Sequence, residues 1–183
     1  MDVTELVDRI SAGERPDYLF FWGHHAAPGR AVGPWVFSQW WPATFVVDGR
    51  EYPTAEHYMM TGKALLFGDE AIAAAIRSAA TPREAKELGR QVANFDEQRW
   101  ADRCSELVEA GNLAKFGQHP ELRDYLLDTG DRVLVEASPV DRVWGIGLAA
   151  DDPRAADPTR WRGRNLLGFA LMQVRDRLSG CRS

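Results

Sequence analysis

The sequence has 183 residues, with 22 Lys and Arg against 27 Asp and Glu, a formal net charge of −5 and 45% hydrophobic residues. This balance excludes a disordered tail, and the 16 Gly and 10 Pro follow no collagen-like period. The length predicts a single domain over residues 1–183, large enough to bury roughly two-thirds of the surface that its unfolded chain exposes.

No segment approaches the about 20 consecutive apolar residues that span a bilayer, and the acidic N-terminus is unlike a signal peptide. We therefore expect a cytoplasmic protein without a membrane partner. Cys104 and Cys181 lie far apart and lack the spacing of metal ligands, which predicts neither a disulfide nor a zinc site. Lysine is scarce beside nineteen Arg, so Lys63, Lys86 and Lys115 each merit inspection.

The N-terminal third predicts a helix, a strand and a hairpin. Residues 4–13 show the pattern of a short amphipathic helix, and the apolar run at 18–24 is typical of a strand. Asp48-Gly49 between two alternating segments is a strong hairpin signal, which predicts two strands over about 43–52.

The middle of the chain is predicted to be helical. Thr54 is placed to cap the first of these helices, and Thr81 begins a capping box with Pro at the first helical position. The predicted helices cover residues 55–67, 69–80, 82–92, 96–116 and 120–128.

The C-terminal part begins with an alternating strand at 132–138. Residues 140–164 hold Gly, Pro and Asp at high density, which predicts a long loop that lines a site or covers it. A helix over 165–178 closes the chain. The predicted fold class is α+β, predominantly helical, with a small β-hairpin and a short sheet.

The helix at 55–67 carries an unusual face. Its side chains at i, i+3, i+4, i+7 and i+11 share one side, so a carboxylate and an ammonium flank apolar residues. Ionised groups on a buried stripe are costly unless they are paired or functional. An ordinary amphipathic helix, with the Lys stem reaching outward, also explains the pattern. The five residues are Glu56, Met59, Met60, Lys63 and Phe67.

Other chemistry-bearing residues give weaker signals. His57 and Tyr58 stand beside Glu56, but no pair of His or Cys residues has metal-ligand spacing, so no metal is expected. Ser38 and Cys104 lack the motifs of nucleophiles, and the GIG segment at 145–147 falls short of a nucleotide-binding fingerprint.

Aromatic and basic residues supply further pocket candidates. Most of the seven Trp are expected in the core, whereas Trp144, between Asp141 and two glycines, is expected to line a pocket. Four arginines near the C-terminus have the planar fork that suits a pyrophosphate, or they form an exposed, solvated loop. These are Arg154, Arg160, Arg162 and Arg164.

Together these segments resemble the YbiA-like NADAR domains over residues 18–178. The resemblance is carried by the P-T-x-E-H-Y segment with a downstream Lys, by D-x-x-W-G at 141–145, and by G-x-N-x-L-G at 163–168. Gln39-Trp40 departs from the Asn-Phe that commonly follows the Ser in this family. The segment between Trp144 and Asn165 is also longer than in compact members.

The resemblance implies a compact N-glycoside hydrolase without a cofactor. It implies removal of ADP-ribose from ADP-ribosylated guanine, in DNA or a nucleotide, as an antitoxin to an ADP-ribosyltransferase encoded nearby. Hydrolysis of riboflavin-pathway intermediates and non-catalytic ADP-ribose binding are the alternatives. The residues carried over as catalytic are Glu56, Lys63 and Asp141. Those expected to bind substrate are Ser38, Gln39, His57, Tyr58, Trp144, Gly145, Arg164, Asn165 and Gly168.

Two mechanisms remain open. In the first, a partly neutral Lys63 attacks C1 of a ring-opened ribose to form a Schiff base, and Glu56 transfers protons. In the second, Glu56 activates water against an oxocarbenium-like centre, and Lys63 only binds oxygen atoms.

Overall fold

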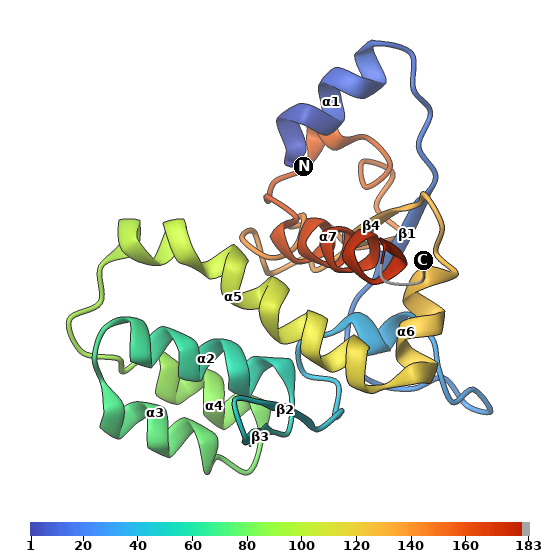
Figure 1. Cartoon of the computed structure of the whole chain (residues 1–183). Helices are drawn as coiled ribbons and strands as arrows, with labels where there is room; N and C mark the ends of the chain where they lie inside the picture. The colour runs from blue at the N-terminus through green and yellow to red at the C-terminus, as the bar shows by residue number, and fades with distance from the viewer. Residues whose placement is uncertain (181–183) are drawn as a thin grey trace. The chain divides into compact units, whose positions relative to one another are not determined.

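A computed structural model of the chain describes residues 1–180, which divide into two compact units; Cys181 lies outside the described residues. The terminal unit comprises Met1–Ser38 and the chain from Glu121 onward, and the central unit comprises Gln39–Pro120. Helices dominate both units and the strands are short, so the predicted α+β, predominantly helical class is confirmed (Figure 1).

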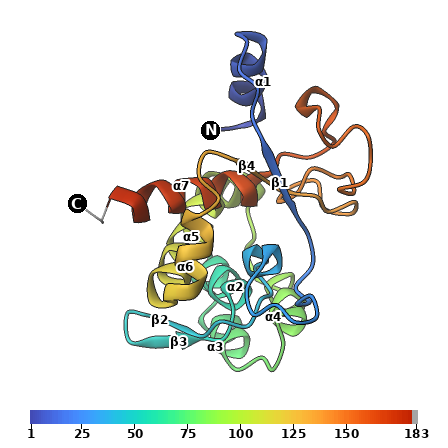
Figure 2. The same cartoon turned by 90° about the vertical axis from the view of Figure 1, so that its right-hand side faces the viewer.

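The terminal unit is built around two parallel strands from distant parts of the chain. β1 pairs with β4 from Tyr18↔Val133 to Phe21↔Glu136, and helix α7 packs against β4 (Figure 2). The apolar sequences of both strands explain their burial in this unit. The elements of this part of the chain are α1 (Val3–Ser11), β1 (Tyr18–Phe21), the 3₁₀ helix η1 (Pro34–Phe37), α6 (Pro120–Leu127), β4 (Val133–Glu136), the 3₁₀ helix η2 (Pro158–Arg160) and α7 (Leu166–Gly180).

The central unit places α2 among three other helices. α2 contacts α3, α4 and α5, and a short antiparallel hairpin, β2–β3, packs beside α5 (Figure 1). Side chains of Thr54, Asp69, Thr81 and Asp96 cap the four helices at their N-termini. The elements are β2 (Phe45–Val47), β3 (Arg50–Tyr52), α2 (Ala55–Leu66), α3 (Glu70–Arg77), α4 (Pro82–Gly89) and α5 (Glu97–Gln118).

Two glycines set the distance between α2 and α5. A Cβ on Gly62 would lie 2.8 Å from a methyl carbon of Leu107, and a Cβ on Gly111 would lie 2.6 Å from the Tyr58 ring. The contacts run in opposite directions along the two helices, which are therefore antiparallel. Consequently the N-terminus of α2 lies beside the C-terminal part of α5.

The structure differs from the sequence prediction at several boundaries. The strand predicted to reach residue 24 ends at Phe21, and the helix predicted to reach residue 92 ends at Gly89. The helical turn η1 is absent from the prediction because its Pro and aromatic residues also suit a loop. The tryptophan prediction was wrong: of the seven, all within the described residues, only Trp35 is buried.

Candidate active site

Glu56 is held at the first turn of α2 by a buried polar network. Its backbone N–H donates to the carbonyl oxygen of Gln39 at 3.0 Å, and the side-chain Oε1 of Gln39 accepts from Asn112 Nδ2 at 2.8 Å. Glu56 is 3% exposed and Asn112 fully buried. Gln39 therefore joins the start of α2 to α5, and it links a sequence-predicted acid to an amide that the sequence did not single out.

Lys115 follows Asn112 by three residues on α5 and lies on the same side of that helix. It is fully buried, and its ammonium lies 5.1 Å from the centre of the Phe116 ring. Burial lowers the pKa of Lys115 from 10.5 to about 7, because the charged form is poorly solvated there. A substantial fraction of this side chain is thus a neutral amine at physiological pH.

Lys63 occupies a different setting. Its Nζ donates to the carbonyl oxygen of Gly89 at 2.7 Å and lies over the rings of Phe95, at 4.3 Å, and Trp100, at 5.7 Å. Burial, and secondarily the charge of Arg90, lowers its pKa. This lysine satisfies the last turn of α4, a contact that a structural role explains.

His57 has both ring nitrogens engaged. Nδ1 lies 2.8 Å from the Thr54 hydroxyl, and Nε2 lies 3.1 Å from the carbonyl oxygen of Ala79. Because a carbonyl only accepts, Nε2 carries the proton and Nδ1 accepts from Thr54. Burial lowers the pKa of His57, which favours this neutral tautomer.

Tyr58 lies on another side of α2, in an aromatic cluster. Its ring centre is 5.0 Å from that of Tyr52 and 5.9 Å from that of Phe45. Burial raises the pKa of Tyr58, with smaller contributions from Tyr52 and Asp48. The predicted substrate-binding role of Tyr58 therefore competes with an evident packing role.

In the terminal unit, Asp141 and Trp144 form one tight turn. The Oδ1 atom of Asp141 accepts from the backbone N–H groups of Val143 and Trp144, each at 2.8 Å, and Ser138 Oγ accepts from the Asp141 N–H at 3.1 Å. The carboxylate thus fixes the backbone that presents Trp144, which is half-buried.

Asn165 ties the end of this loop to β4. Its Oδ1 accepts from the Glu136 N–H and its Nδ2 donates to the carbonyl of Leu134, both at 2.9 Å, while its own N–H donates to Gly145 at 3.2 Å. Gly168 packs against the same strand, since a Cβ there would lie 2.1 Å from the Leu134 oxygen. These three predicted site residues form one constellation whose amide groups support the loop.

The remaining predicted residues are more dispersed. Ser38 ends η1, where its N–H donates to Trp35 at 3.2 Å, and Arg164 is exposed. Arg154 is not available as a phosphate fork in this arrangement, because its Nε and Nη2 atoms donate to the two oxygens of Asp152 at 2.9 and 2.6 Å.

The structure joins the predicted residues into two groups, one in each unit. Hydrogen bonds connect Gln39 with Glu56 in the central unit, and the Asp141–Trp144 turn stands beside the Asn165 constellation in the terminal unit. Sequence reasoning missed Asn112 and Lys115. The available signal was their i, i+3 spacing within an otherwise charged helix.

Two further searches concern residues 1–180. No group of three or more His, Cys, Asp or Glu side chains in this range is arranged to hold a metal ion. Within the same range, none of the helices has the length and apolar content needed to cross a membrane.

Comparison with known proteins identifies the family. The model of the NADAR domain matches residues 20–179, which is most of the chain. The chain belongs to the NADAR domain family. The resemblance inferred from the P-T-x-E-H-Y, D-x-x-W-G and G-x-N-x-L-G segments is thereby confirmed.

The relatives of this NADAR protein include named enzymes. An N-glycosidase of Acanthamoeba polyphaga mimivirus is 42% identical over 168 residues, covering 89% of this chain and 97% of that protein. The N-glycosidase YbiA of Escherichia coli is 34% identical over 139 residues, covering 76% of this chain and 77% of YbiA. The prediction of a hydrolase acting on N-glycosyl bonds is confirmed at this level.

A solved structure supports the same relationship. The NMR structure of Escherichia coli YbiA matches with a TM-score of 0.73 at 28% sequence identity, over 92% of this chain and 89% of that one. The predicted YbiA-like fold of this NADAR protein is therefore confirmed.

Proposed function

We propose that this protein hydrolyses the N-glycosidic bond between ADP-ribose and guanine, in a nucleic acid or a nucleotide, and so reverses the action of an ADP-ribosyltransferase toxin in the cytoplasm. The observation that carries the proposal is the buried acid Glu56, bound through Gln39 to Asn112, one helical turn from the buried amine of Lys115. A carboxyl group and a neutral amine are the groups that a Schiff-base route needs.

The proposed reaction proceeds in two steps. The lysine amine adds to C1 of the ring-opened ribose, and the guanine amino group leaves with a proton that Glu56 donates. Water then adds to the resulting imine, Glu56 removes its proton, and ADP-ribose is released with the lysine restored. One water is consumed, and no oxidant or reductant is required.

Two lysines of the central unit are candidates for the amine. Lys63 was assigned from the sequence, but its Nζ donates to Gly89 at 2.7 Å. Lys115 is fully buried, and its pKa of about 7 matches what a nucleophilic amine requires. These features favour Lys115 as the nucleophile and Lys63 as a support of the helix packing.

The activity is tested by incubating the full chain with an oligonucleotide that contains ADP-ribosylated guanine and weighing the products by mass spectrometry. Glu56→Gln should lower the rate of ADP-ribose release about 100-fold or more, since general acid–base catalysis is lost. Glu70→Gln, an exposed acid in the first turn of α3, is the matched control. Undiminished release by the Glu56 variant would favour a role in binding instead.

The nucleophile is tested by adding borohydride during turnover, which traps an imine as a stable adduct. A peptide adduct at Lys115, absent from Lys115→Met and present in Lys63→Met, is the expected result. An adduct at Lys63 would restore the sequence assignment, whereas no adduct during active turnover would favour direct attack by water. If folded protein releases no ADP-ribose, the riboflavin-pathway intermediates are the next substrates.

A further inference from the structure

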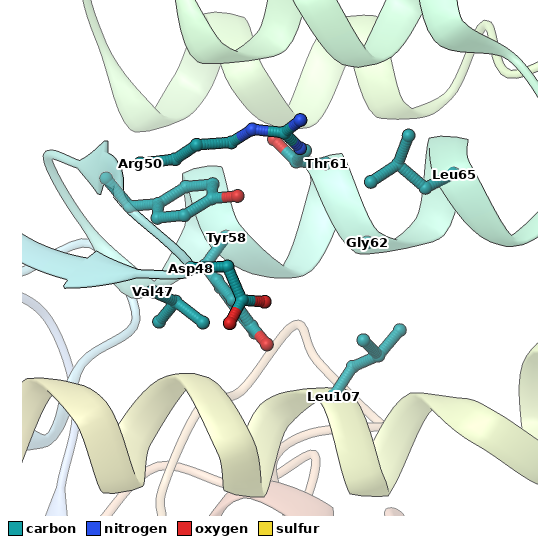
Figure 3. A pocket seen from close by; sticks show the side chains of 9 residues that line it. Val47, Asp48, Arg50, Tyr58, Thr61, Gly62, Leu65 and Leu107 are labelled. Carbon is teal, nitrogen blue, oxygen red and sulfur yellow. The ribbon is translucent and has the colours of Figure 1, made fainter.

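The central unit carries a pocket on a side of α2 not used by the proposed reaction. The pocket has a volume of about 210 Å³ and lies where the β2–β3 hairpin meets α2 and α5 (Figure 3). Its lining residues are Val47, Asp48, Arg50, Tyr52, Tyr58, Thr61, Gly62, Leu65 and Leu107.

This pocket is distinct from the proposed catalytic face. Leu65 lines the pocket and follows Glu56 by nine residues, which is about two and a half turns of an α-helix. The two side chains therefore leave α2 in opposite directions. A ligand in this pocket is an additional one rather than the glycosidic substrate.

The hairpin wall of the pocket is held firmly in place. The Gln118 side chain accepts from the Val46 N–H at 2.9 Å and donates to the Val46 carbonyl at 2.8 Å, so it continues the hydrogen bonding of β2. Asp48 and Gly49 have φ angles of 50° and 73°, as a type I′ turn requires. This turn fixes the directions in which Asp48 and Arg50 leave the hairpin.

Thr61 provides an unsatisfied polar group at the pocket wall. The residue is 1% exposed, and its Oγ1 atom has no hydrogen-bond partner in the part of the chain that the structure describes. Buried hydroxyl groups are normally paired, so an unpaired one that lines a pocket indicates that a bound molecule supplies the partner.

The pocket carries both signs of charge. Asp48 and Arg50 both line it, and within the described residues no ion pair joins them. Figure 3 shows Arg50 beside Thr61 along one side, with Asp48 and the Tyr58 hydroxyl on the other. Leu65 and Leu107 complete an apolar wall between these two sides.

We propose that this pocket binds a free α-amino acid with an apolar side chain. The carboxylate would meet the Arg50 guanidinium and the Thr61 hydroxyl, the ammonium would meet Asp48, and the side chain would lie against Leu65 and Leu107. A simple anion would face Asp48, and a simple cation would face Arg50. The volume is below the about 300 Å³ at which pockets begin to enclose drug-sized ligands, so a dinucleotide is too large.

The test is an NMR titration of the full-length protein with L-leucine as the probe. Saturable shifts are expected for backbone amides of residues 47–65 and of Leu107. Leucinamide lacks the carboxylate and N-acetyl-leucine lacks the ammonium, so each should bind at least about tenfold more weakly, a loss of 1.4 kcal/mol. Equal binding of all three compounds, or no saturable shift at tens of millimolar leucine, overturns the proposal.

Variants assign the groups. Thr61→Val should weaken leucine binding about tenfold whereas Thr61→Ser retains it, because only the hydroxyl differs in kind between these two replacements. Asp48→Asn keeps a residue that tolerates positive φ and should remove the preference for leucine over N-acetyl-leucine. Glu51→Gln, beside Arg50 on β3 but outside the pocket lining, is the control. Unchanged affinity in Thr61→Val would exclude the proposed carboxylate contact.

Discussion

A lysine that loses its exposure also loses part of its charge, and Lys115 shows what this does to reactivity. The residue is fully buried and its pKa is about 7, whereas an exposed lysine near 10.5 is almost entirely protonated at neutral pH. An amine attacks a carbonyl-like carbon only in its neutral form. The burial of a single residue therefore supplies the activation that the proposed reaction needs.

This account predicts a pH dependence of catalysis. We expect kcat/KM to rise as pH increases from 6 to 8, with a midpoint near pH 7, because the free enzyme loses its proton from Lys115 over this interval. The measurement is a steady-state pH profile on ADP-ribosylated guanosine. Lys63→Arg should keep this midpoint, and a profile that stays flat down to pH 6 would contradict the assignment.

His57 predicts a separate effect of pH, on stability. Burial lowers its pKa below the ordinary 6.5, so as pH falls below this value the unfolded chain binds more protons than the folded one. The free energy of unfolding should therefore decrease as pH falls from 7.5 to 5.5. Urea denaturation at both values, together with an NMR titration of the His57 ring, measures it. A folded-state pKa above 6.5 would contradict the argument.

At the scale of elements, helix caps and turns were predictable because they depend on neighbouring residues. Thr54, Thr81 and Asp96 cap helices as expected, and Asp48-Gly49 forms the hairpin turn. The predicted end of α4 at residue 92 was wrong. Gly89 ends this helix where its carbonyl accepts from Lys63, a contact across 26 residues of sequence that no local pattern reveals.

The candidate site was only partly predictable for the same reason. Glu56 stood out because an acid on an apolar stripe is unusual within one helix. Lys115 did not, since its burial depends on segments that are distant in sequence, and within α5 it follows a series of exposed charged residues. Asn165 was expected near substrate, but its contacts with Leu134 and Glu136 show a supporting role that spacing alone cannot indicate.

Helix packing gives a matched pair of substitutions within α5. Gly111→Ala should lower the free energy of unfolding by about 1–3 kcal/mol, because the new methyl group would overlap the Tyr58 ring. Gly117→Ala, in the same helix and with open space around it, should raise that free energy by up to about 1 kcal/mol. Urea denaturation of both variants measures the difference. Equal effects would contradict the close approach of α2 and α5.

At the scale of the whole molecule, charge limits how nucleic acid is bound. The chain carries a net charge of −5, and Arg154 is already paired with Asp152, so few cations remain for phosphates. We expect the affinity for an ADP-ribosylated oligonucleotide to fall less than about tenfold between 50 and 200 mM salt, because six or more phosphate contacts would cost about 1,000-fold.

Fluorescence anisotropy at several salt concentrations measures this dependence. An unmodified oligonucleotide of the same sequence is the control, and it should bind much more weakly because recognition depends on the modified base. A steep salt dependence shared by both oligonucleotides would contradict the expectation and indicate a basic surface that tracks the backbone.

The pairing of β1 with β4 has a consequence for the order in which the protein forms during its synthesis. Tyr18 pairs with Val133, 115 positions further along the chain. At translation rates of about 5–20 residues per second, β1 waits roughly 6 to 23 seconds on the ribosome before its partner strand has been made. The contiguous segment Gln39–Pro120 emerges within that interval. The nascent chain therefore carries the apolar strand Leu19, Phe20 and Phe21 unpaired while the central helices are already available to fold, which makes β1 a natural binding site for a ribosome-associated chaperone.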